Sequence, residues 1–129
     1  MKTLKAQVSF EFIALFIVVM VAFLFFLAIY SEFQSVTNQV IQRDKASAAA
    51  QTLADAINTI LSSEGVSLNL ELPHGYTISQ GVRSVIAVDS LNFKGSAAIL
   101  TDSLNITLPA NATNITVRKS AGIIYITGN

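Results

Sequence analysis

The first half of the chain contains one long apolar stretch. Residues 12–30, FIALFIVVMVAFLFFLAIY, include no charge and no side-chain amide. A helix needs about 20 apolar residues to cross the hydrocarbon core of a bilayer. The stretch also lacks the polar face of a helix on the surface of a soluble domain, and the rest of the chain is too small to cover it. It is therefore predicted to be a transmembrane helix.

Beyond this stretch, apolar residues recur at steps of mostly three or four, which is the period of an amphipathic helix. The stripe consists of Phe33, Val36, Val40, Ala46, Ala50, Leu53, Ile57 and Ile60. No glycine or proline interrupts residues 7–63, so we predict one long helix within the segment 7–64. A coiled coil is the competing interpretation of its second half, although Arg43 and Asp44 interrupt the stripe and no strict heptad holds.

After Gly65 the period of the apolar residues changes to two, as in half-buried strands. Strands separated by turn residues are predicted at 66–72, 76–79, 82–89, 96–100, 104–108, 114–118 and 123–127. Residues 65–129 are thus expected to form a small antiparallel β head. A sheet this small needs a cover for its apolar face, and the stripe from Ala50 to Leu61 is the predicted cover. The predicted fold class is α+β.

The charges around the apolar stretch predict its orientation in a membrane. Lys2 and Lys5 precede it, so the positive-inside tendency keeps the N-terminus in the cytoplasm and places the head outside. The sequence SEFQSVTNQV follows the stretch, and it does not resemble the small-residue cleavage site of an ordinary secretory signal. Cleavage after the apolar stretch is not favoured. A plain stop-transfer anchor is the alternative interpretation, but it leaves Glu11 unexplained.

The composition argues against nucleic-acid binding, metal binding and catalysis. Eight Lys and Arg balance eight Asp and Glu, so no basic excess indicates nucleic acid. The chain has no cysteine and one histidine, His74, and it has no calcium-loop motif, so we expect no metal site. Neither Ser79 nor Ser84 belongs to a nucleophile elbow. We therefore expect neither an enzyme nor a cofactor.

Glu11 lies at the start of the apolar stretch, where a carboxylate is costly unless it is paired, protonated or functional. Alone, it would be explained as a boundary carboxylate at the positive end of a helix. The surrounding sequence, KAQVSFEFIAL, however places Gln7, Ser9, Glu11 and Leu15 in the order Q-x-S-x-E-x-x-x-L.

This motif, the short basic leader, the apolar helix and the β-rich head together resemble the archaeal type IV pilin-like proteins that carry class III signal peptides. The resemblance implies a type IV pilin-like fold and removal of residues 1–6 by a prepilin peptidase, which cuts between Ala6 and Gln7. It implies identical subunits in a helical homopolymer, and a pilus assembly ATPase with its membrane platform. The cytoplasmic membrane would hold the precursor, and an adhesive filament would lie at the cell surface.

Cleavage would give Glu11 a partner. It creates an α-amino group at Gln7, four residues or roughly 6 Å of helix rise before Glu11. A buried carboxylate gains most from a nearby cation. Pairing within one chain is conceivable, whereas the resemblance implies pairing with the amine of a neighbouring subunit. An N-terminal glutamine can also cyclise, which would remove the charge.

The head contains three matches to the N-x-[ST] acceptor pattern for N-glycosylation, at Asn105, Asn111 and Asn114. At least one is expected to carry a glycan, because the head is predicted to be extracellular. The competing interpretation is a strand and loop that are simply rich in Thr and Asn.

Two further classes of protein fit parts of the pattern. One is an uncleaved, single-span membrane-anchored ectodomain, which would retain residues 1–6. The other is an archaellum-type filament subunit, which shares the leader and the apolar helix, although Gln7 and Ser9 resemble the adhesive pilins more closely. Major and minor pilins are not distinguished by these residues.

Overall fold

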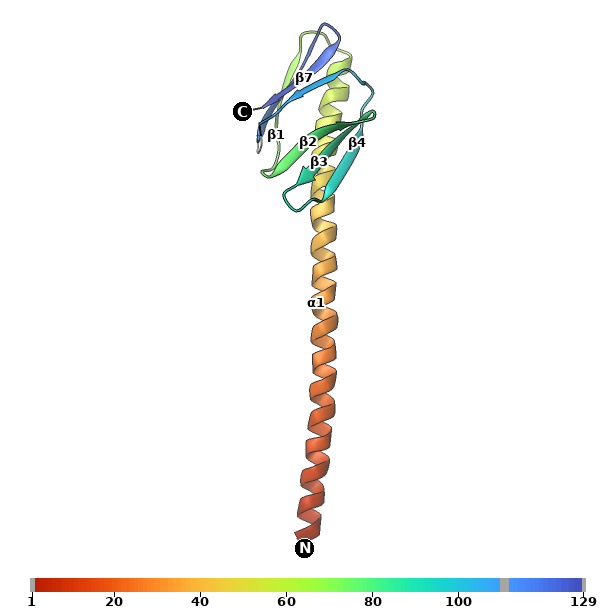
Figure 1. Cartoon of the computed structure of the whole chain (residues 1–129), viewed down its shortest axis with the longest axis vertical. Helices are drawn as coiled ribbons and strands as arrows, with labels where there is room; N and C mark the ends of the chain where they lie inside the picture. Colours follow the sequence, from red (N-terminus) through yellow and green to blue (C-terminus); the bar gives the residue numbers. More distant parts are fainter. Residues whose placement is uncertain (1, 110–111, 129) are drawn as a thin grey trace. The chain divides into compact units, whose positions relative to one another are not determined.

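A computed structural model describes the backbone of residues 2–109 and 112–128, and side chains from residue 10 onwards in these ranges. Its elements, shown in Figure 1, are α1 (Lys2–Leu61), β1 (Ser67–Glu71), β2 (Tyr76–Gly81), β3 (Ser84–Asp89), β4 (Lys94–Ala98), β5 (Leu104–Thr107), β6 (Asn114–Ser120) and β7 (Ile123–Gly128). The chain divides into two compact units, Met1–Asn38 and Gln39–Asn129. The α+β class and the long N-terminal helix are confirmed.

The first unit consists of helix, and all its described side chains, from Phe10 to Asn38, are exposed. The most apolar 18-residue window of the helix has a mean hydropathy of 3.3, and none of it is buried. By length and composition, α1 is able to cross a membrane. The helix is therefore compatible with membrane anchoring.

The second unit contains seven strands in two sheets, with strand orders β1-β6-β7-β5 and β2-β3-β4. The seven predicted strands are all present, with ends that differ by a few residues. The prediction of a purely antiparallel head was wrong, because β5 pairs with β7 in parallel. The tight β6–β7 hairpin, which turns at Ala121 and Gly122, brings β7 back between β6 and β5. Strand β7 thus separates two strands that are consecutive in the sequence.

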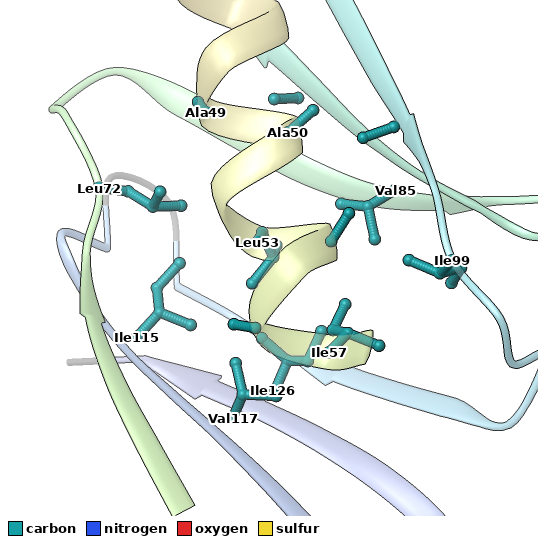
Figure 2. Close-up of a cluster of buried hydrophobic side chains, with 14 of the residues drawn as sticks. Ala49, Ala50, Leu53, Ile57, Leu72, Val85, Ile99, Ile115, Val117 and Ile126 are labelled. Carbon is teal, nitrogen blue, oxygen red and sulfur yellow. The ribbon is translucent and has the colours of Figure 1, made fainter. Parts of the chain in front are cut away.

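The core of the second unit forms where α1 meets both sheets. Figure 2 shows Leu53 and Ile57 of α1 between the two sheets. Ile115 of the four-stranded sheet lies on one side of them, and Val85 of the three-stranded sheet lies on the other. Leu53, Ile57, Val85 and Ile115 are almost completely buried. The prediction that the stripe from Ala50 to Leu61 covers the sheet is confirmed. The residues at the start of the longer apolar stripe, Phe33, Val36 and Val40, are exposed.

A close backbone approach brings β4 against α1. A Cβ atom added to Gly95 would collide with the carbonyl carbon of Ala46 and the backbone nitrogen of Ser47. Small buried residues surround this crossing, namely Ala46, Ala49, Ala50, Ala87 and Ala97. Because none of them carries more than a methyl group, strand and helix can pack almost backbone to backbone.

Polar side chains fix the C-terminal end of α1 to the head. Lys119 Nζ donates a hydrogen bond to the carbonyl oxygen of Leu61 at 2.8 Å and lies 3.2 Å from Glu64 Oε2. A lysine in this position satisfies a carbonyl that the helix leaves unpaired. Asn58 accepts a hydrogen bond from the Leu100 backbone nitrogen at 3.0 Å. The helix ends at Leu61, within the predicted segment 7–64, and the left-handed Gly65 (φ 76°) follows it.

Candidate functional site

The predicted processing region lies at the start of α1. The backbone of residues 6–9 is helical, whereas the side chains of Ala6, Gln7 and Ser9 lie outside the described side chains. Cleavage between Ala6 and Gln7 therefore stays a prediction. Because the helix is continuous from Lys2, Glu11 is one helical turn after Gln7, about 6 Å along the axis.

Glu11 and Leu15 are both exposed on α1. Among the described side chains, the ion pairs are Arg83–Asp102 and Lys119–Glu64, and neither involves Glu11. The Glu11 carboxylate is thus accessible to a partner outside the described part of the chain. Its predicted role in assembly is neither supported nor contradicted by these contacts.

The exposed apolar side chains of the first unit form a surface that needs a cover. Phe10 is 73% exposed, Phe25 67% and Phe33 67%. Soluble monomers rarely expose contiguous apolar patches larger than a few hundred Å². No described side chain covers this surface, since residues 10–38 are all exposed. Lipid or another protein chain would provide such a cover.

The outer face of the four-stranded sheet carries two of the three predicted glycosylation sites. It consists of the side chains that alternate with the buried ones along its strands, including Asn69, Glu71, Asn105, Thr107, Asn114, Thr116, Arg118, Tyr125 and Thr127. The predicted acceptors Asn105, in β5, and Asn114, in β6, are both exposed on this face. Asn111 lies outside the described residues.

Sheet register places these residues side by side. Asn105 pairs with Tyr125, which pairs on its other side with Arg118. Thr127 lies between Thr107 and Thr116 in the next row. A shallow hollow of about 440 Å³ on this face is lined by Thr116, Arg118, Ser120, Tyr125 and Thr127. The side chains that line this hollow provide aliphatic hydroxyl groups, one guanidinium group and one phenol ring.

Residues considered for catalysis and metal binding are scattered. His74 is exposed after the end of β1, and the described part of the chain contains no group of three His, Cys, Asp or Glu side chains placed to hold a metal ion. Burial raises the pKa of the Tyr76 phenol, and the nearby Asp89 carboxylate raises it further. Tyr76 lines a small hollow with Thr77, Pro109 and other residues, and its described lining contains no carboxylate, histidine or lysine.

Comparison with models of protein families, with curated proteins and with solved structures found no match. The function is therefore inferred from the residues themselves. The sequence did not indicate the neighbours of Asn105, because the parallel pairing of β5 with β7 joins residues that no local pattern connects. Alternation along 104–107 did indicate that Asn105 and Thr107 share one face of a strand.

Proposed function

We propose that this chain is the structural subunit of an archaeal type IV pilus-like adhesive filament. It would be made as a precursor in the cytoplasmic membrane, cleaved between Ala6 and Gln7, and assembled through its N-terminal helix. The observation that carries the proposal is that one helix presents two kinds of surface. Its described side chains up to Asn38 are all exposed and mostly apolar, whereas the stripe from Ala46 to Ile60 is buried under two sheets.

The exposed apolar part of α1 suits both locations that the proposal requires. Lipid tails and apolar side chains offer similar surroundings, so moving such a helix from one to the other changes little hydrophobic energy. Phe12, Phe16 and Phe26, each more than half exposed, could contact lipid in the precursor and identical helices in the filament. The β head would keep its polar outer face towards solvent.

Glu11 would select the correct position of a subunit during assembly. A carboxylate in an apolar environment costs several kcal/mol, and a cation at hydrogen-bonding distance offsets that cost. The α-amino group that cleavage exposes at Gln7 is such a cation. Pairing with the amine of a neighbouring subunit would favour one axial position over others, and only a processed subunit could supply the amine.

The test is the mass of the N-terminus of the protein sheared from the native cell surface without any added tag. The proposal expects a chain that starts at Gln7 in a fraction enriched in filaments, with a free α-amino group, because a cyclised Gln7 would have no charge to pair with Glu11. A chain that still starts at or near Met1 and is found only in membranes would overturn it. That result would favour an anchored ectodomain, which the same apolar helix would equally suit.

A further inference from the structure

The parallel pairing of β5 with β7 places an acceptor asparagine next to an aromatic ring. Asn105 is exposed on β5, an edge strand of its sheet, and pairs in register with the half-buried Tyr125. Thr107 Oγ1 donates a hydrogen bond to Asn105 Oδ1 at 3.4 Å. The amide and the hydroxyl of this N-x-T pattern therefore lie together on the outer face.

The hollow beside Tyr125 has the chemistry of a carbohydrate platform. Its volume of about 440 Å³ lies within the range of small-ligand sites. Thr116, Thr127 and Ser120 provide hydroxyls that both donate and accept hydrogen bonds, and Arg118 provides further donors. The Tyr125 ring offers an apolar face with a polar tip, which suits the C–H face and hydroxyl rim of a sugar.

We propose that Asn105 carries an N-linked glycan whose first sugar residues lie on the outer face over Tyr125. The donor would be an oligosaccharide linked to a polyprenyl phosphate or pyrophosphate. Asn105 Nδ2 forms a bond to C1 of the first sugar as the bond from C1 to the lipid phosphate oxygen breaks. The electron pair of that bond leaves with the phosphate, and Nδ2 releases one proton to a base. This inference rests on the proposed function, because the proposed function places the head outside the cytoplasm, where the glycan would be added.

The second described acceptor provides an internal comparison. Asn114 pairs with Glu71, and the hollow beside it, about 370 Å³, is lined by Asn69, Glu71 and neighbouring residues without an aromatic ring. Thr116 Oγ1 donates its hydrogen bond to Asn69 Oδ1 at 2.9 Å. A glycan on Asn114 would therefore have no ring to lie on. It is expected to contribute less to the stability of the head than a glycan on Asn105.

The experiment starts with intact glycopeptide mass analysis of the full-length protein from its native cells, which should show a modified Asn105. Thermal unfolding in detergent then compares the native sequence, Thr107→Val, Tyr125→Ser and the double variant. Loss of the glycan in Thr107→Val should lower the melting temperature by about 3–5 °C, the scale of one modest interaction in a domain of this size. The same loss should have little effect once Tyr125 is replaced by serine, whereas Tyr125→Phe should behave like the native sequence.

Two controls separate the glycan from the substitutions. The same variants made in a host without N-glycosylation report what each substitution does to the bare chain. Asn114→Gln should change the melting temperature equally in the native sequence and in the Tyr125→Ser variant. An unmodified Asn105 in native protein, or a glycan effect that is independent of the side chain at position 125, would overturn the inference. The N-terminal mass from the same preparation tests the filament proposal separately, so either idea can fail without the other.

Discussion

Replacing Gly95 by alanine tests the close crossing of β4 over α1. The added Cβ atom would collide with the carbonyl carbon of Ala46 and the nitrogen of Ser47, and both atoms belong to the helix backbone. Carbon atoms attract each other at about 3.5–4.0 Å and repel strongly when much closer. Rotation of a side chain cannot relieve a collision with backbone, so the strand or the helix must shift. Overpacking of this kind typically costs about 1–3 kcal/mol.

The matched control is Gly81→Ala. An alanine Cβ at this position would also collide, but with Ser84 Oγ, the end of a small side chain that can rotate away, and it would lie 3.2 Å from Cδ1 of Ile86, the far end of a flexible side chain. Gly81 does not have a left-handed backbone, so alanine should be tolerated there and could even stabilise the protein by about 0.4–1 kcal/mol. The two variants therefore make the same chemical change with opposite expected outcomes.

The assay is thermal and guanidinium unfolding of the full chain in detergent, followed by tyrosine fluorescence, in which Tyr76 and Tyr125 report on the head and Tyr30 adds signal from the apolar part of α1. A loss of about 2 kcal/mol corresponds to a fall of roughly 8–16 °C in the melting temperature of a domain of 60–100 residues. Ala46→Gly should not rescue Gly95→Ala, because the obstructing atoms are in the backbone. If Gly95→Ala melts with the native protein or with Gly81→Ala, the close approach of β4 to the helix is refuted.

Three further predictions follow from other parts of the chain. Lys119→Met keeps the aliphatic stem but removes the donor to the Leu61 carbonyl, so the free energy of unfolding should fall by about 1–2 kcal/mol in guanidinium unfolding. The control is Glu64→Gln, at the exposed end of the same ion pair, which should lower the free energy of unfolding by less than about 1 kcal/mol. Because burial raises the pKa of Tyr76 in the folded state, the unfolded state ionises first, and stability should fall as the pH rises above about 10. Tyr76→Phe should reduce that fall in alkaline unfolding curves, and identical curves would contradict the assignment. Glu11→Gln should reduce the yield of sheared filaments, but leave the precursor in the membrane fraction, and a normal yield would contradict the proposed charge pairing.

The elements of the head could be predicted because their signals are local. The change of period at Gly65 and the turn residues between apolar runs located all seven strands. The burial of Leu53 and Ile57 followed from one argument, that a small sheet needs a cover and that one stripe was available. Each of these signals requires only residues that are near each other in the sequence.

The arrangement of the strands could not be predicted in the same way. Alternation along β5 shows which face holds Asn105, but it does not show that β7 rather than β6 becomes its neighbour. That neighbour depends on the β6–β7 hairpin, which inserts β7 into the sheet. The contact of Gly95 with Ala46 was missed because the predicted strand began at residue 96, so Gly95 was expected among the turn residues, whereas it lies inside β4.

The distribution of small and large residues explains how one helix can meet two kinds of surroundings. At the head, Ala46, Ala49 and Ala50 let β4 approach the backbone, and the larger Leu53 and Ile57 fill the space between the sheets. Before residue 39 most of the apolar side chains are large, and none of the described ones finds a cover within the chain. Since burial of such side chains in water-free surroundings is worth about 25 cal/mol per Å², this part of the helix must obtain its stability from lipid or from other chains. A water-soluble monomer would leave this apolar surface uncovered.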